Sequence, residues 1–223
     1  MDDIVRQSDG VYGVAREDAA LFALMKAMAT GDGDSALAML AASPGLAKAS
    51  LGAGATREAA RDHYFKEIEH YAYGGDTALH IAAAAYQLKI AKALVGRGAD
   101  VRARNRRGGE PLHYAADGVP GSPSWNPPQQ EKVIAFLIAA GADPDAIDNS
   151  DVAPLHRAVR TRCAGAVRAL LEGGADARKK NKSGSTPMDL AVKLTGRGGS
   201  GSPEAKAEQV KIVRLLEAQP SIS

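Results

Sequence analysis

The chain has 223 residues, including 44 alanines and only ten aromatic residues, with 28 lysines and arginines against 26 aspartates and glutamates. This length suits one domain or one repeat array. Its small side chains favour closely packed helices over a β-sheet. The near balance of charge excludes a strongly charged tail and a general nucleic-acid binder. The single cysteine, Cys163, excludes an internal disulfide framework and a cysteine-rich zinc site.

The first apolar segment indicates a cytoplasmic protein. Residues 19–29 follow Glu17 and Asp18 and contain Lys26, whereas a secretory signal places basic residues before an unbroken apolar core. No apolar run reaches the roughly 18 residues that a membrane helix needs. A lone cysteine also suits a reducing compartment. We therefore expect a cytoplasmic location and no membrane partner.

The N-terminal part predicts a helix pair. Residues 1–16 have no periodic pattern, and we expect them to be flexible. Residues 17–30 and 33–43 each carry apolar residues at helical spacing, with Gly31-Asp32-Gly33 between them. We expect two helices here, with Asp32 available as an N-cap.

A further helix is predicted over residues 56–73, because its apolar residues recur at helical spacing. That stripe consists of Ala60, Tyr64, Ile68 and Tyr71. With the preceding pair, this helix would make residues 17–73 a helical region ahead of the rest of the chain.

A short motif recurs four times in the remaining sequence. Its copies are Thr77-Ala-Leu-His80-Ile-Ala82, Glu110-Pro-Leu-His113-Tyr-Ala115, Ala153-Pro-Leu-His156-Arg-Ala158 and Thr186-Pro-Met-Asp189-Leu-Ala191. A Gly-Ala-Asp run follows each of the first three copies, starting 18, 28 and 18 residues after the motif histidine, at Gly98, Gly141 and Gly174. The spacing of the motifs and that of the Gly-Ala-Asp runs both indicate a repeating unit of 33 residues, whose second copy holds ten extra residues.

Each unit predicts two helices. Thr186 followed by Pro187 suits an N-cap and the first helical position. Ala153 has no side-chain acceptor, so we expect the third unit to start its first helix less firmly. The second helix, with apolar residues spaced by three and four, should end at the glycine of the Gly-Ala-Asp run, which suits a left-handed C′ position.

These motifs resemble the ankyrin repeat family, whose signature is T-P-L-H-x-A with a period of about 33 residues. The resemblance implies an all-α solenoid of helix–turn–helix units with short β-turn fingers, over four repeats in residues 74–218. It also implies that residues 17–73 cap one end. The fourth copy departs from the pattern at Met188 and Asp189. The Ala-, Gly- and Arg-rich composition hints at a bacterial source.

Two inserts interrupt the repeats, and both lie between the two helices of a unit. The first, at about residues 118–129, contains the only tryptophan, Trp125, among prolines. Trp125 would either anchor the loop on the helices or be exposed for recognition. The second, at about residues 195–203, is rich in glycine and serine and contains Arg197. Residues 219–223 form a short tail.

The histidines and the cysteine predict structural roles. The motif histidines lie one per unit without carboxylate or thiolate neighbours, and the resemblance implies that they hydrogen-bond backbone and neighbouring loops. They are His80, His113 and His156. Cys163 has no nearby base. No catalytic signature occurs in the sequence, so we expect no enzyme, no metal and no cofactor.

The fingers predict the binding surface. The resemblance implies that partners dock on the finger tips and on the inner face of each first helix. The residues at these positions are Arg104, Arg106, Arg107, Asp117, Asn149, Arg160, Lys180, Lys182 and Lys193. Residues 1–76 carry a net charge of −5 and residues 157–223 a net charge of +7. We therefore expect a monomeric, non-enzymatic protein–protein interaction module, a regulator or effector, whose protein partner carries acidic patches.

Two alternatives remain open at the opposite edge of the solenoid. One is recognition by Trp125. The other is binding of a small anion or nucleotide by Arg197 and the amides of residues 196–202. That segment lacks the lysine of a phosphate-binding loop and follows a helix rather than a strand. Nucleic acid is disfavoured by the acidic N-terminal part and the few aromatic residues.

Overall fold

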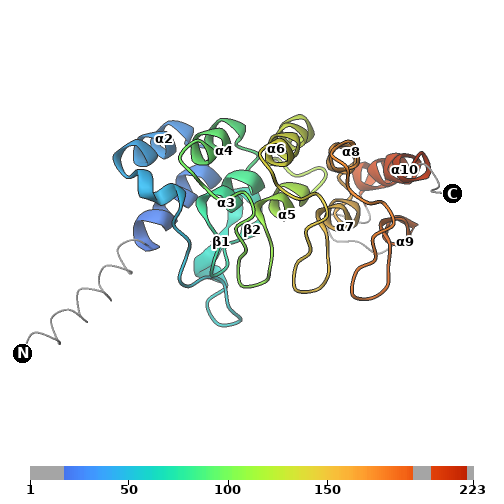
Figure 1. Ribbon diagram of the computed structural model, residues 1–223, viewed down its shortest axis with the longest axis horizontal. Helices are drawn as coiled ribbons and strands as arrows, with labels where there is room; N and C mark the ends of the chain where they lie inside the picture. The colour runs from blue at the N-terminus through green and yellow to red at the C-terminus, as the bar shows by residue number, and fades with distance from the viewer. Residues whose placement is uncertain (1–17, 193–201, 220–223) are drawn as a thin grey trace, which may run out of the picture.

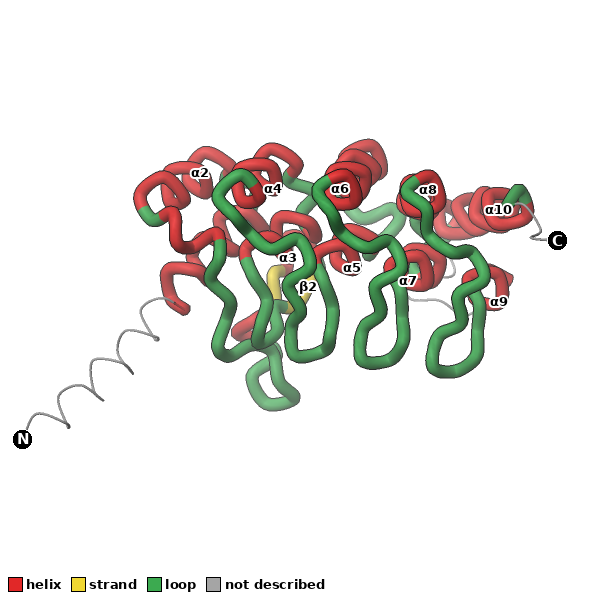
Figure 2. Tube along the Cα trace, viewed as in Figure 1, coloured by secondary structure: helices red, strands yellow, loops and turns green. Residues whose placement is uncertain are grey.

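The computed structural model describes residues 18–192 and 202–219. Helices stack in two rows, and loops project from one side of the stack as fingers (Figures 1 and 2). The first helices of the four repeats are α3 (Ala78–Ala84), α5 (Pro111–Ala116), α7 (Pro154–Arg160) and α9 (Pro187–Val192). The second helices are α4 (Leu88–Val95), α6 (Pro127–Ala139), α8 (Ala164–Glu172) and α10 (Pro203–Glu217). The predicted all-α solenoid is confirmed.

Left-handed glycines end the second helices as the sequence predicted. Gly98, Gly141 and Gly174 have φ angles of 85°, 103° and 93°. A side chain at such a residue would be strained, which explains why the same residue type recurs in every complete unit.

The motif histidines cap the first helices, including the one that Ala153 begins. His156 Nδ1 accepts the backbone N–H of Ala153 at 3.2 Å, and His113 Nδ1 accepts that of Glu110 at 3.1 Å. The imidazole thus makes the capping-box hydrogen bond in which the side chain at N3 accepts the backbone N–H of the N-cap residue. The expectation of a weak start at Ala153 omitted this contact, which does not depend on the side chain at the N-cap position.

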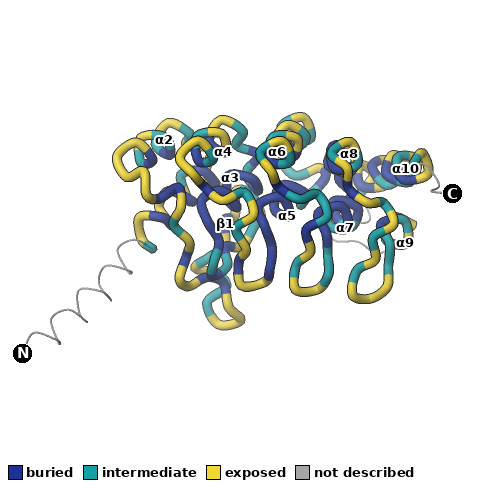
Figure 3. Tube along the Cα trace, in the orientation of Figure 1, coloured by how far each residue is buried: buried dark blue, intermediate teal, exposed yellow. Residues whose placement is uncertain are grey.

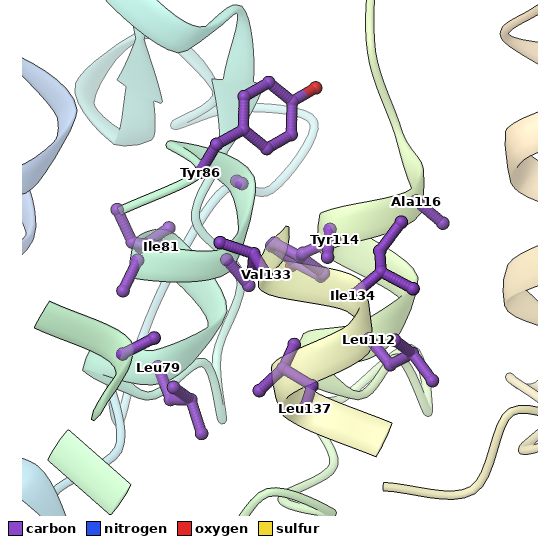
Figure 4. Close-up of a cluster of buried hydrophobic side chains, with 14 of the residues drawn as sticks. Leu79, Ile81, Tyr86, Leu112, Tyr114, Ala116, Val133, Ile134 and Leu137 are labelled. Atoms are coloured by element: carbon purple, nitrogen blue, oxygen red, sulfur yellow. The ribbon is translucent and has the colours of Figure 1, made fainter. Parts of the chain in front are cut away.

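The core lies between the rows and between successive units. Buried residues run along the whole stack, while the finger tips are mostly exposed (Figure 3). Leu79 and Ile81 of α3, Leu112 of α5, and Ile134 and Leu137 of α6 are almost fully buried together (Figure 4). One unit cannot cover its own apolar face, so each unit depends on its neighbour for burial.

The predicted N-terminal helix pair is present. Residues 18–29 are helical, and α2 (Gly33–Ala42) follows with the Asp32 side chain accepting the N–H of Ser35 at 3.1 Å. Four apolar side chains of the first helix have no exposed surface, namely Leu21, Leu24, Met25 and Met28. A short 3₁₀ turn, η1 (Pro44–Ala47), leads into the next loop.

The predicted helix over residues 56–73 is wrong. This segment forms η2 (Arg61–His63), β1 (Tyr64–Phe65), η3 (Lys66–Ile68) and β2 (His70–Tyr71), and the two strands pair as an antiparallel hairpin. Phe65 stacks on Phe22 with ring centroids 5.3 Å apart, and His70 stacks on Tyr114 at 4.3 Å. Aromatic residues favour extended backbone, and these tertiary contacts outweigh the weak helical periodicity.

The first insert is shorter than predicted. The Asn126 side chain accepts the N–H of Gln129, and Pro127 takes the first position of α6. The loop therefore ends at Asn126, because Asn before Pro is a favourable helix start. The predictions for residues 1–16, 195–201 and 220–223, with Lys193 and Arg197, lie outside the described residues. No described helix is long and apolar enough to cross a membrane.

Candidate functional site

The fingers are joined tip to tip by backbone hydrogen bonds. Arg106 N–H donates to Gly74 O at 2.8 Å and Asn149 N–H to Arg107 O at 3.0 Å, and Lys182 N–H donates to Ser150 O at 3.3 Å. Each adjacent pair of fingers shares one such bond. The tips therefore form a continuous edge with fixed spacing, and their side chains are presented as a set.

The first finger, residues 99–110, presents two arginines whose charges are not neutralised. Arg107 Nη1 donates to the Tyr73 hydroxyl at 2.9 Å, and its guanidinium lies 4.9 Å from the Tyr73 ring centroid. Arg106 also lies against Tyr73 and donates to the carbonyl of Ala55. These contacts orient both side chains. Neither arginine forms an ion pair among the described residues.

The second finger, residues 142–153, uses most of its carboxylates in contacts with other parts of the array. Three of its four aspartates bind groups of neighbouring elements or of the helix behind them. The contacts are Asp143 with Arg102 at 3.5 Å, Asp145 with the N–H of Asp176 at 3.0 Å, and Asp148 with Arg157 at 3.0 Å. Two of these carboxylates, those of Asp143 and Asp148, thus pair with a cation, whereas Asp145 is held by a backbone N–H.

Two predicted site residues form contacts between the first and second fingers. Arg104 Nη2 donates to Ile147 O at 2.8 Å, and Asn149 Nδ2 donates to Arg106 O at 3.1 Å. On the third finger, residues 175–186, Lys180 and Lys182 are exposed, and neither side chain has a hydrogen bond or ion pair among the described residues. Arg104 and Asn149 thus hold the edge together, while the lysines stay free to contact a partner.

A cavity of about 530 Å³ lies between the fingers, the first helices and the first insert. It brings together six of the predicted residues. They are Arg106, Arg107, Asp117, Trp125, Asn149 and Arg160. Finger residues and Trp125 line the same space, although the sequence assigned them to opposite edges. Trp125 is partly buried and packs against the core, so the insert folds over the floor of the groove.

Arg157 is the centre of the cavity floor. Its Nη1 donates to Asp117 Oδ2 at 3.0 Å and its Nη2 to Asp148 Oδ2 at 3.0 Å. His70 Nε2 lies 3.8 Å from Asp117 Oδ2. Burial of Asp117 opposes its ionisation, but the charge of Arg157 and the contact with His70 outweigh burial and hold its pKa well below the usual range.

Sequence reasoning missed four residues of this floor and wall. Tyr114 and Arg157 occupy the variable position of the L-H-x-A motif in two successive units, which was a usable signal. His70 and Tyr86 had no such sequence signal, because tertiary contacts bring them to the cavity. His70 lies in the hairpin, and the Tyr86 hydroxyl donates to the carbonyl of Asp117 at 2.6 Å. Tyr114 donates to Asp76 at 2.7 Å, which fixes its ring beneath His70.

The histidines and the cysteine have the structural roles that were predicted. His80 Nε2 donates to Gly109 O at 3.1 Å, His113 Nε2 to Val152 O at 3.0 Å and His156 Nε2 to Ser185 O at 3.2 Å. Burial lowers the pKa of each imidazole, that of His113 to about 4. Burial raises the pKa of the Cys163 thiol to about 12, so it stays protonated and unreactive at neutral pH.

Comparison with known proteins agrees with this architecture. Two family models match, one described as ankyrin repeats in three copies over residues 38–123 and one as ankyrin repeats in many copies over residues 137–191. The chain belongs to the ankyrin repeat family. The first match begins within α2, ahead of residue 74, where the sequence placed the start of the repeats. Ankyrin arrays are interaction modules, and this chain is accordingly a protein–protein interaction module.

The curated relatives are larger proteins that contain similar repeats. The chain is 35% identical to mouse "Ankyrin repeat and SOCS box protein 16" over 128 residues, covering 57% of this chain and 28% of the relative. It is 32% identical to human "Ankyrin repeat and SOCS box protein 6" over 154 residues, covering 64% and 34%. It is 28% identical to Arabidopsis "E3 ubiquitin-protein ligase KEG" over 177 residues, covering 76% and 10%. The chain thus spans about a third or less of these relatives. They are eukaryotic and lend no support to a bacterial source.

Proposed function

We propose that this ankyrin array binds an extended, acidic segment of a protein partner along the groove between the finger tips and the first helices. The observation that carries this proposal is the distribution of uncompensated charge. Arg106 and Arg107 on the first finger, and Lys180 and Lys182 on the third, have no carboxylate partner among the described residues. Two of the four aspartates on the finger between them, Asp143 and Asp148, are paired with arginines within the array.

Uncompensated cations on one edge favour an acidic partner in two ways. They raise the rate of encounter, because an opposite charge is steered toward the edge. They also fix the position of the partner along the edge, because the two cationic fingers are separated by one that carries no basic residue. Since these side chains are exposed, their attraction is screened by salt, and the association rate should fall as salt concentration rises.

The proposal is tested by charge reversal on the first finger. We expect Arg106→Glu with Arg107→Glu to lower the association rate for a captured and purified partner by about tenfold or more. The matched control is Lys89→Glu with Lys132→Glu, which changes the net charge equally on exposed positions of α4 and α6. If the finger variant and the control bind the partner alike, the finger edge is not the binding surface.

The relatives' names indicate how far the proposal extends. They combine ankyrin repeats with a SOCS box or with a ubiquitin-ligase description, but the matched repeats cover only 10% to 34% of those proteins. We therefore propose a binding role alone for this chain, as a regulator or effector. A cytoplasmic location remains part of the proposal, because a free buried thiol suits a reducing compartment. A monomeric state is proposed as well.

A further inference from the structure

Resting on the proposed function, we propose that the groove cavity accepts one tyrosine side chain of the acidic partner segment, whose hydroxyl donates a hydrogen bond to Asp117 Oδ1. The cavity volume of about 530 Å³ lies within the usual range of ligand pockets. Interfaces concentrate their binding energy in a few large side chains that fill such pockets.

The cavity walls are supplied by the two segments that break the repeat pattern. Tyr71 comes from the hairpin and Trp125 from the first insert, and both line the cavity. Tyr86 closes it from the end of α3, where its hydroxyl bonds the backbone of Asp117. Aromatic walls on several sides favour an aromatic guest, because rings gain from stacked and edge contacts beyond the area they bury.

The floor presents one unused acceptor. Asp148 uses both carboxylate oxygens, since Oδ1 accepts the N–H groups of Ser150 and Val152 and Oδ2 accepts Arg157. Asp117 uses Oδ2 for Arg157. Among the described residues Asp117 Oδ1 accepts no hydrogen bond. It is also absent from the set of fully buried polar atoms without a partner, so part of its surface is exposed. It therefore remains accessible to a donor from the guest.

The charges around this acceptor select a neutral donor. An arginine or lysine guest would meet Arg157, which already binds Asp117 at 3.0 Å, and would pass Arg106 and Arg107 on the rim. A phosphotyrosine would be attracted by Arg106 and Arg107 on the rim, but its phosphate would lie against the ionised Asp117 on the floor. A phenylalanine would displace water from Asp117 Oδ1 and offer no donor in return. Tyrosine supplies the ring and the neutral donor together.

The experiment uses peptide pools and two independent readouts. Each pool contains short peptides with aspartate and glutamate flanks and one fixed central residue, either tyrosine, phenylalanine, arginine, phosphotyrosine or alanine. Binding is measured by anisotropy of labelled pools and by the emission of Trp125, the only tryptophan in the chain. We expect the tyrosine pool to bind about tenfold more tightly than the phenylalanine pool and to shift the Trp125 emission.

The hairpin offers a matched pair of variants. Tyr64 and Tyr71 are cross-strand partners, each 39% exposed, with ring centroids 4.7 Å apart. Only Tyr71 lines the cavity, yet replacing either one removes the same ring contact. We expect Tyr71→Ala to weaken the tyrosine pool several-fold and Tyr64→Ala to leave it unchanged.

Several outcomes would overturn the inference. These are equal affinity for the tyrosine and phenylalanine pools, tighter binding of the arginine or phosphotyrosine pool, unchanged Trp125 emission on binding, and equal effects of the two hairpin variants. If the finger reversal still slows partner association in any of these cases, the proposed function stands and only the tyrosine pocket is wrong. If the reversal has no effect, the proposed function fails on its own account.

Discussion

The motif histidines and the groove cavity are built on opposite principles. His80, His113 and His156 repeat one arrangement three times, each accepting the N–H that starts its helix and donating to the next finger. The cavity combines repeated positions, such as Tyr114 and Arg157, with unrepeated ones. Its aromatic walls at Tyr71 and Trp125 come from a hairpin at residues 64–71 and an insert ending at Asn126, each present once in the described part of the chain. The repeated contacts stabilise the array, whereas the segments that depart from the repeat form the walls of a single binding cavity.

The largest expected effect is a loss of folding stability as pH falls, caused by the buried motif histidines. The unfolded imidazole of His113 takes up a proton near pH 6.5, whereas burial lowers the folded pKa to about 4. Between these values the unfolded state binds more protons, so stability decreases as pH decreases and the loss is complete below about pH 4. His113 alone should cost about 3 kcal/mol. Urea unfolding across this range measures it.

The control for this pH dependence is the same titration on His113→Gln. That variant should lose a clear part of the slope between about pH 6.5 and pH 4, because its side chain does not titrate. An unchanged slope would mean that His113 is not the group responsible.

Next in size is the removal of one histidine at neutral pH. His113→Ala leaves the N–H of Glu110 and the carbonyl of Val152 without their partner, and should lower the free energy of unfolding by about 1–3 kcal/mol. Urea denaturation measures the loss. A loss within the error of that measurement would show that water replaces these contacts and that the repeat motif stabilises little.

Gly118 lies where the repeat and the insert meet. A Cβ at this position would lie 2.7 Å from Cys163 Sγ, 2.9 Å from the Tyr86 hydroxyl and 3.1 Å from Trp125 Cδ1. Gly118→Ala should therefore cost about 1–2 kcal/mol by overpacking and shift the Trp125 emission. Gly45→Ala, where a Cβ meets nothing within 4 Å, is the control and should leave both readouts unchanged.

The sequence predicted the regular part of this molecule and not the irregular part, for a physical reason. Gly98 could be interpreted alone, because a left-handed turn is a local requirement, and the role of His113 followed from the resemblance of its motif. The hairpin could not, because its backbone follows from stacking of His70 on Tyr114, which belongs to the next repeat. For the same reason the sequence placed Trp125 on the opposite edge from the finger arginines, whereas Trp125, Arg106 and Arg107 line one cavity.

The smallest expected effect is that of a chelator. Three histidines at regular spacing suggest a metal site, but each imidazole already uses both nitrogens, accepting a backbone N–H at Nδ1 and donating to a carbonyl at Nε2. A ligating nitrogen needs a free lone pair, and within residues 18–192 and 202–219 no three His, Cys, Asp or Glu side chains lie close enough to share an ion. Melting in the presence and absence of EDTA should therefore give the same Tm. A Tm lower by several degrees in EDTA would mean that a metal stabilises the array and that the hydrogen-bonded imidazoles are not its main stabilising feature.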